Sequence, residues 1–191
     1  MKHLIVYCHP NPKSFNHAIL DTFAGELQKK NEVRLRDLYA LDFDSVLKGS
    51  DFVALQKGTA PADIQIEQDH IRWADVITFV FPIWWTGLPA RLKGYIDRVF
   101  SHGFAYSIGS QGVQPLLSSK KAVIFNTTGS PKELYESSGM VKSLNQMMED
   151  GILRFCGIQV LRHVYFNAVP FVSDADRKAM LEEVRRVAQS I

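Results

Sequence analysis

The sequence predicts an α/β protein, a three-layer α/β/α sandwich built on a five-stranded parallel sheet. Strand and helix signals alternate through nearly all 191 residues, as they do in chains built from βαβ units. The run Val76–Phe81 is apolar without polar alternation, as in a strand buried on both faces of a parallel sheet. No linker, repeat or low-complexity tract divides the chain, so we expect residues 1–191 to form a single domain.

The amino-terminal half begins with an apolar strand, followed by a helix that Ser14 can cap. Residues 33–37 alternate between apolar and charged side chains, which predicts a half-exposed strand at the edge of the sheet. Residues 39–63 show no regular period, and we expect a connection with little structure. The predicted elements of this half are a strand at His3–Cys8, a helix over 14–30, a strand over 33–37, a helix over 64–73 and a strand over 76–81.

The carboxy-terminal half starts with a turn in which Thr86 or Gly87 can cap the next helix. Pro89 falls in the first turn of that helix, where its missing N–H group costs nothing. Residues 101–119 are rich in Gly and Ser and lack a period, which predicts a surface loop. The remaining predicted elements are a helix over 89–100, a strand over 121–126, a helix over 138–150, a strand over 158–166 and a last helix that Ser173 caps in a capping box with Asp176.

Composition and charge narrow the classes of function. The chain is 46% hydrophobic and 22% charged with a net charge of +2, so nothing in its charge favours nucleic-acid binding. Cys8 and Cys156 lie in apolar segments without CxxC spacing, and we expect both to be buried rather than redox-active. The six histidines form no HxH or HExxH motif, and no metal site is predicted. Without a signal peptide or a membrane-length apolar run, we expect a cytoplasmic protein.

Three loops that follow predicted strands carry residues suited to ligand binding, and the carboxyl ends of parallel strands meet at one edge. Residues 9–16 open onto a helix, where N–H groups, Ser14 and Lys13 could hold a phosphate. The alternative is that this segment is only a turn stiffened by two prolines. Trp84 and Trp85 offer faces for a planar aromatic ligand, or else serve as core or dimer contacts.

The third loop, residues 126–135, is polar and contains Gly129, where a backbone can approach a ligand closely. Its N–H and hydroxyl groups could stabilise negative charge at the edge of a ligand. Tyr135 would be a neutral hydrogen-bond donor at pH 7. Taken alone, this segment is also compatible with an ordinary polar loop.

Five segments of the chain resemble segments of a known family and occur in the same order and with the same spacing as in that family. They read HPNPKSFNHA, EQDHIRWADVITFVFPIWWTGLPARLKGYIDRVF, SHGFAY, NTTGSPKELY and GILRFCGIQVL. They are similar to the NAD(P)H:quinone oxidoreductases, flavodoxin-like proteins that include the ancillary subunits of potassium-efflux systems. The resemblance implies a flavodoxin-like fold and a noncovalent flavin, FAD or alternatively FMN, with NADH or NADPH as electron donor. It also implies a quinone acceptor and a homodimer with two sites at the subunit interface.

The resemblance assigns roles to residues by position. The cofactor-binding positions that it implies are His9, Lys13, Ser14, Phe15, Asn16, Gln68, Pro82, Ile83, Trp84, Trp85, Thr127, Thr128, Gly129 and Tyr135. Gln68 matches a contact to the nucleotide part, whereas Tyr135 and Gly129 are the catalytic candidates that would stabilise the reduced ring. The substrate pocket would be bordered by Trp84, Thr86 and Tyr106.

Three positions depart from the family pattern. Ser130 stands where the animal enzymes have a second glycine, and Val141 where they have a histidine that assists the tyrosine. Thr86 replaces an aromatic residue, which would widen the mouth of the pocket. The long carboxy-terminal extension of the animal enzymes has no counterpart in this chain.

The function that follows is two-electron reduction of quinones, and of nitroaromatic or azo compounds, by ping-pong hydride transfer through a bound flavin. A second hypothesis is a regulatory flavoprotein that contacts a membrane potassium-efflux transporter. A one-electron carrier is a third hypothesis, although such flavodoxins are generally acidic and this chain is not. A nucleotide-binding protein without flavin is the remaining alternative.

Overall fold

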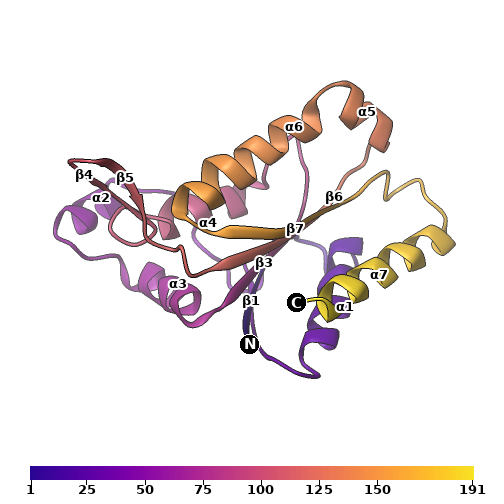
Figure 1. The fold of residues 1–191 in the computed structure, drawn as a ribbon, viewed down its shortest axis with the longest axis horizontal. Helices are drawn as coiled ribbons and strands as arrows, with labels where there is room; N and C mark the ends of the chain where they lie inside the picture. Colours follow the sequence, from indigo (N-terminus) through magenta and orange to yellow (C-terminus); the bar gives the residue numbers. More distant parts are fainter.

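The computed structural model describes residues 1–191 and contains a five-stranded sheet in the order β2-β1-β3-β6-β7. All neighbouring strands in it pair in parallel. Helices cover both faces of the sheet (Figure 1), which confirms the predicted three-layer α/β/α sandwich. Its strands are β1 (Lys2–Tyr7), β2 (Glu32–Asp37), β3 (Val76–Pro82), β6 (Lys121–Thr127) and β7 (Gln159–Phe166).

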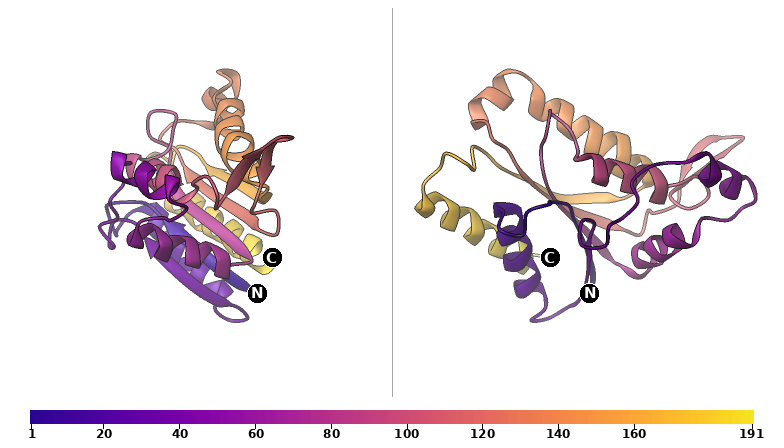
Figure 2. Two further views of the ribbon diagram at one scale, coloured as in Figure 1. Left: turned by 90° about the vertical axis from the view of Figure 1, so that its left-hand side faces the viewer. Right: turned by 180° about the vertical axis from the view of Figure 1, so that it is seen from behind.

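The two faces of the sheet carry separate apolar cores. Figure 2 shows α1 and α7 together on one side of the sheet and α6 on the other. Phe23 of α1 packs edge-on against Phe125 of β6, with ring centroids 5.0 Å apart, in the core between the sheet and helices α1 and α7. No helix combines the length and the apolar character that crossing a membrane requires. The main helices are α1 (Phe15–Leu27), α3 (Ala62–Trp73), α4 (Ala90–Val99), α6 (Met140–Asn145) and α7 (Asp174–Gln189).

The burial of the strands follows the sequence pattern. Every residue of β3 is buried, as its uniformly apolar composition predicts, whereas β2 is largely exposed at the sheet edge. Cys8 and Cys156 are both buried and unpaired. Burial raises the pKa of the Cys8 thiol to about 12, so the reactive thiolate form is disfavoured.

Two of the predicted helix caps are confirmed and one is wrong. Ser14 accepts a hydrogen bond from the N–H group of His17, and Ser173 forms a capping box with Asp176. Neither Thr86 nor Gly87 caps α4, because both lie in a tight turn before it. The N-cap of α4 is Pro89, which makes no side-chain cap and lies just before the helix rather than within its first turn.

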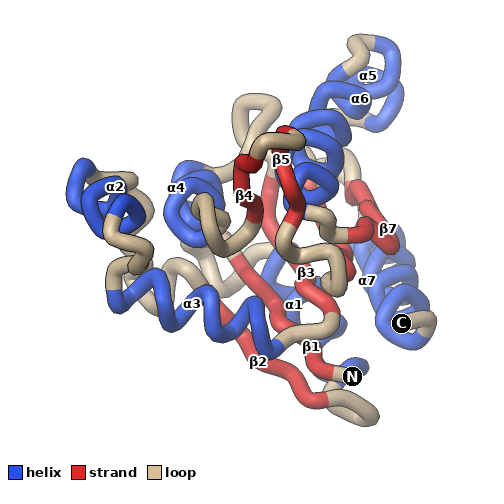
Figure 3. Tube along the Cα trace, turned by 60° about the vertical axis from the view of Figure 1, so that its left-hand side comes forward, coloured by secondary structure: helices blue, strands red, loops and turns tan.

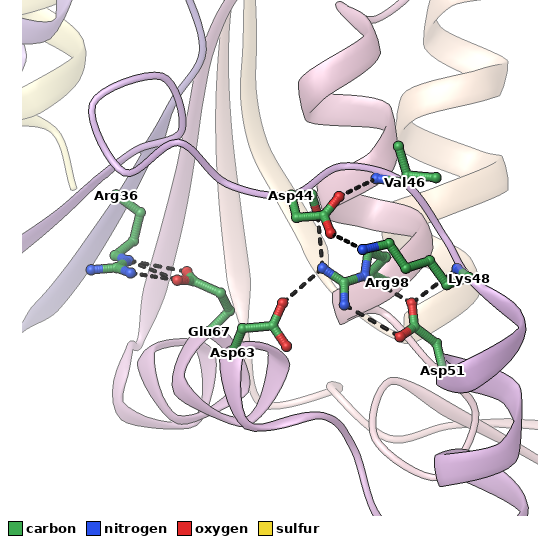
Figure 4. A network of polar contacts seen from close by, with 8 residues as sticks. All are labelled: Arg36, Asp44, Val46, Lys48, Asp51, Asp63, Glu67 and Arg98. Carbon is green, nitrogen blue, oxygen red and sulfur yellow. Dashed lines mark hydrogen bonds and ion pairs between the residues drawn. The ribbon is translucent and has the colours of Figure 1, made fainter.

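The segment 39–63, predicted to have little structure, contains the helix α2 (Gly49–Gln56). Figure 3 shows α2 at the periphery, beyond α3 and α4. A buried ion pair fixes it, since Nε of Arg98 in α4 lies 2.8 Å from Oδ2 of Asp51 (Figure 4). Arg98 also donates to Asp63 and to the backbone carbonyl of Asp44, each over 2.7 Å. The helix α2 is therefore held by a polar contact with a distant residue. Its sequence shows no periodic pattern of apolar residues that would have predicted a helix.

The segment 101–119, predicted to be a surface loop, contains a hairpin of β4 (Tyr106–Gly109) and β5 (Gly112–Pro115). It is exposed as predicted, but its strands pair antiparallel across a two-residue turn. Gly112 has a φ of +93°, a conformation that other residues rarely adopt. The strands are only four residues long each, too short to show alternation.

The helix predicted over 138–150 is not uniform: α6 (Met140–Asn145) continues into the π-helical segment η1 (Gln146–Leu153). A separate helix α5 (Lys132–Ser137) precedes it, and the 3₁₀ turn η2 (Arg154–Cys156) follows it. Gly139, with a φ of +75°, separates α5 from α6. The change to π-helical geometry in η1 places Glu149 within reach of β7, as described below.

Candidate functional site

A hollow of about 420 Å³ opens at the carboxyl ends of β1, β3 and β6, the edge where parallel sheets hold their ligands. It is lined by His9, Ser14, Phe15, Asn16, Pro82, Ile83, Trp84, Trp85, Thr127, Thr128, Gly129, Val169 and Pro170. The three loops singled out in the sequence thus meet at one place. Five of the predicted site residues do not line the hollow: Lys13, Gln68, Thr86, Tyr106 and Tyr135.

One end of the hollow is formed by the start of α1. Ser14 caps this helix, and its hydroxyl oxygen lies 3.3 Å from the hydroxyl of Tyr7 at the end of β1. Phe15 and Asn16 are the first two residues of α1, so their N–H groups have no acceptor within the helix. Together with the positive end of the helix dipole, these groups favour an anionic ligand group.

Asn16 is 3% exposed and carries an unsatisfied acceptor. Its Nδ2 donates to Oγ1 of Thr127 over 2.7 Å. The other amide atom, Oδ1, is buried and has no hydrogen-bond partner. An unpaired buried acceptor costs free energy, and a ligand that donates a hydrogen bond would satisfy it.

The aromatic wall of the hollow lies on a strained turn. Trp84 and Gly87 exchange backbone hydrogen bonds of 3.2 and 3.0 Å, and the residues between them have φ values of 51° for Trp85 and 54° for Thr86. Two successive left-handed residues are typical of a type I′ turn, in which Asn-Gly is the usual pair. Bulky residues there cost about 1–2 kcal/mol each. The turn leaves Trp85 fully exposed, at 101%, and Trp84 partly exposed against the ring of His9.

The opposite edge of the hollow consists of polar backbone. Thr128 is nearly buried and its N–H group donates to the carbonyl of Phe166, whereas the N–H groups of Gly129 and Ser130 donate to no acceptor in the chain. A Cβ atom added at Gly129 would meet no atom within 4 Å. This edge therefore offers backbone donors and free space for a ligand.

Val169 and Pro170 line the hollow but were not predicted. They belong to the loop after β7, and the N–H group of Val169 donates to the carbonyl of Thr128 over 3.1 Å. A signal for them did exist, because the fifth parallel strand must end at the same edge of the sheet as the others.

Three predicted residues belong to the loops around the hollow without lining it. Thr86 is exposed, and its hydroxyl lies 3.8 Å from the sulfur atom of Met140. Tyr135 is 8% exposed within α5, and its hydroxyl group makes no hydrogen bond within the chain. Lys13, also exposed, uses its backbone N–H group to bind the side chain of Asn11.

The other two predicted residues are used elsewhere. Gln68 is buried in α3, and its Nε2 donates to the carbonyl of Val99 and to the hydroxyl of Ser101, each over 3.1 Å. Tyr106 begins the β4–β5 hairpin and packs edge-on against Phe155, with ring centroids 5.1 Å apart. The structure therefore gives both side chains contacts within the fold.

The residues that line the hollow carry little charge. His9 is its only titratable lining residue, and burial lowers the pKa of its imidazole. No Asp, Glu, Lys or Arg side chain lines it. No group of three or more His, Cys, Asp or Glu side chains comes together as metal ligands would. The arrangement suits binding of a planar ligand by stacking and backbone donors, rather than acid–base catalysis by a carboxylate pair.

Comparison with known proteins gives matches over the whole chain. Residues 1–191 match the protein family described as a flavodoxin-like fold. The chain is 39% identical to an NAD(P)H oxidoreductase of Haemophilus influenzae, over 100% of this chain and 95% of that protein. It is 32% identical to human ribosyldihydronicotinamide dehydrogenase (quinone), over 100% of this chain and 91% of that protein. The NAD(P)H:quinone oxidoreductase of Methanothermobacter marburgensis superposes with a TM-score of 0.90 at 28% identity, covering 98% of this chain and 97% of that one.

Proposed function

The chain belongs to the family of flavodoxin-like folds, and we propose that it is a flavin-dependent NAD(P)H oxidoreductase that reduces quinones. The membership confirms the resemblance that the sequence motifs indicated. The proposal is carried by the hollow itself, which combines an exposed indole, backbone N–H donors and the absence of carboxylates at one edge of the sheet. Quinone reductases among its relatives support the choice of acceptor.

The residues of the hollow fit the three chemical parts of a flavin. The N–H groups at the start of α1 suit a phosphate. The unpartnered Oδ1 of Asn16 suits a ribityl hydroxyl group, which can donate to it. The face of Trp85 and the free space at Gly129 suit a planar ring whose polar edge accepts hydrogen bonds.

When bound, a flavin would supply the redox chemistry, accepting two electrons from a reduced nicotinamide and passing them to a quinone. The chain would contribute position and electrostatics. Trp84 and Trp85 would shield one side of the ring from water, while the N–H groups of Gly129 and Ser130 would stabilise negative charge that develops at its edge. We propose that the hydroxyl group of Tyr135, which has no partner in the chain, adds a further donor there.

The same opening would serve both substrates, because a single hollow borders Trp84 and Trp85. The nicotinamide product must then leave before the quinone binds, which is a ping-pong sequence. Steady-state rates measured at several concentrations of NADH or NADPH and of a soluble quinone should give parallel double-reciprocal lines. Converging lines would show that both substrates bind together and would contradict a shared opening.

Identification of the cofactor tests the proposal most directly. The purified protein should show the visible absorption of a flavin, and mass spectrometry of the material released by heat should show FAD, the form that the resemblance implies. Gln68, which the resemblance assigns to the nucleotide part, donates through Nε2 within the fold and lines a second hollow of about 560 Å³. FMN in the released material would correct the cofactor without changing the reaction. A protein that stays colourless after incubation with FAD and with FMN would overturn the proposed function.

We also propose that two copies of the chain associate near the hollow. Trp85 is fully exposed and Phe171, next to the lining residue Pro170, is 82% exposed. Large aromatic side chains exposed together favour a protein contact. Light scattering during gel filtration should give the mass of a dimer, and Phe171→Ser should shift it toward the 21.6 kDa monomer.

A further inference from the structure

A chain of buried polar groups runs beneath the polar edge of the hollow. Nε2 of His163 in β7 lies 2.7 Å from Oδ1 of Asn126 in β6, and Nδ1 lies 2.9 Å from Oε1 of Glu149 in η1. The side chains of His163 and Glu149 are only 6% and 14% exposed. These three residues are called the histidine bridge here, since the imidazole joins two strands and a helix.

The orientation of Asn126 is fixed by its surroundings. Its Nδ2 lies 3.2 Å from the carbonyl oxygen of Phe81 and equally far from that of Phe125. A rotated amide would turn its oxygen toward both carbonyl oxygens, which repel it. The nitrogen must therefore face the carbonyls, and Oδ1 accepts a hydrogen bond from Nε2 of His163.

The other side of the imidazole faces the carboxylate of Glu149. Oε2 of Glu149 accepts a hydrogen bond from Nη2 of Arg154 over 3.1 Å, so this carboxylate also forms an ion pair with an arginine. An ionised carboxylate only accepts hydrogen bonds, so Nδ1 of His163 must donate to it. Both bonds exist together only when the imidazole carries two protons. A neutral ring has a single N–H group and loses its hydrogen bond either to Glu149 or to Asn126.

The histidine bridge holds the part of the sheet on which the hollow is built. Asn126 directly precedes the lining residues Thr127 to Gly129, and its bond to Phe81 crosses to the residue before Pro82. The side chain of Asn126 therefore adds a cross-strand hydrogen bond between β6 and β3 directly beside the residues that line the hollow.

We propose that His163 is a positioning residue that sets the polar edge of the hollow through Asn126, and that this action requires the doubly protonated ring. The inference rests on the proposed function only in taking the ligand of the hollow to be a flavin. His163 touches neither ligand nor substrate. It acts on the flavin affinity by fixing the strand ends that carry the N–H donors.

The direction of the pH effect follows from the groups around the ring. Glu149 is the one charged group in contact with it, Tyr165 of the same strand stacks on it at 4.3 Å between centroids, and Asn126 is neutral. Burial lowers the pKa of His163 and outweighs the opposing effect of the Glu149 carboxylate. The ring is therefore doubly protonated only as the pH falls below about 6.5, the ordinary value for histidine. We expect flavin affinity to rise over that same interval.

The first measurement follows the ring itself by long-range ¹H–¹⁵N NMR of the purified protein, with the His163 signals identified by their loss in His163→Gln. As the pH falls, both ring nitrogens should become protonated, and the amide signals of Thr127, Thr128 and Gly129 should shift with the same midpoint. Glu149→Gln keeps the imidazole but removes its ion-pair partner, so the midpoint should fall by about one pH unit. A ring that titrates without moving these amides would overturn the proposal.

The second measurement is the dissociation constant of FMN or FAD from pH 5 to pH 8, obtained by fluorescence quenching. The wild-type protein should bind more tightly below the NMR midpoint, by about tenfold. His163→Gln retains an N–H donor for Asn126 but cannot titrate, so its affinity should not vary over this interval. His102→Gln changes an exposed histidine and should keep the wild-type profile. An unchanged profile in His163→Gln would refute the inference. If neither flavin binds, the proposed function fails while the NMR titration still decides whether the bridge moves the edge.

Discussion

Asn16 and Thr127, 111 residues apart in the chain, are joined by a hydrogen bond of 2.7 Å from Nδ2 to Oγ1. The bond connects the first turn of α1 to the end of β6, and both residues are nearly buried in the wall of the hollow. Because Asn126 is held from the other face of the sheet by His163, the end of β6 is fixed on both sides. The site is thus ordered by contacts within the fold before any ligand binds.

Thr127→Val should destabilise the protein by about 1–3 kcal/mol, because it removes the acceptor of a buried amide and leaves Asn16 without any partner. The free energy of unfolding measured in urea would show the loss. Thr127→Ser keeps the hydroxyl group and should retain most of the stability. Equal losses in both variants would mean that the methyl group, rather than the hydrogen bond, is important.

Gly129→Val should leave the fold intact and weaken flavin binding by about tenfold or more, because the new side chain occupies the free space of the hollow. Titration with FAD and FMN, together with the thermal midpoint, separates the two effects. Gly25→Ala in α1 is the matched control, since a Cβ atom there also meets nothing within 4 Å but lies outside the hollow. If Gly129→Val binds flavin normally, the ring does not approach this backbone.

Tyr135→Phe should slow reduction by NADH or NADPH about tenfold, because one of several donors to the reduced ring is lost while the backbone donors remain. Rapid mixing with reduced nicotinamide in the absence of quinone isolates this half of the reaction. Tyr39→Phe, which alters a tyrosine stacked under Arg91, should leave that rate unchanged. An unaltered rate in Tyr135→Phe would remove this residue from the mechanism.

Arg98→Met should lower the free energy of unfolding by about 3–5 kcal/mol, because it leaves the buried carboxylate of Asp51 without its counter-ion. Urea denaturation measures the total loss, and hydrogen exchange should show α2 opening first. Lys93→Met breaks the exposed pair with Asp97 in the same helix and should cost less than about 1 kcal/mol. Similar losses in both variants would contradict a special role for the buried pair.

Acid should destabilise the protein partly through His3, which is fully buried in β1 with neither ring nitrogen hydrogen-bonded. Burial lowers the pKa of this imidazole in the folded state, so the unfolded chain binds more protons once the pH falls below about 6.5. Its contribution to stability is present above that pH and is lost as the pH falls through the folded-state pKa. His3→Leu should therefore lose less stability than the wild type between pH 6.5 and 5 in urea unfolding. A constant difference between the two proteins over this range would exclude the mechanism.

Much of the fold could be predicted because its signals are local. The apolar run of β3 and the capping patterns at Ser14 and Ser173 depend on residues close together in the sequence. The helix α2 could not be predicted, since it is fixed by Arg98, which lies 47 residues from Asp51. The break after α5 depends on the conformation of Gly139, which a helical period does not reveal.

The difference between local signals and contacts of distant residues also explains which site residues could be predicted. Residues in loops that directly follow strands were predicted correctly to meet, because sheet topology alone brings them together. Gln68 and Tyr106 were proposed from the family pattern, and the structure places both outside the hollow. The histidine bridge went unnoticed because Asn126, Glu149 and His163 meet only when a π-helical segment faces the last strand.

The turn between Trp84 and Gly87 has a consequence for protein engineering. Asn-Gly in place of Trp85-Thr86 would relieve two unfavourable backbone conformations and should raise the melting temperature. The same replacement would remove the exposed indole that faces the ligand. A directed-evolution screen that rewards heat resistance alone would therefore select colourless variants at these two positions, and a screen for thermostable enzyme must also reward retention of the yellow flavin.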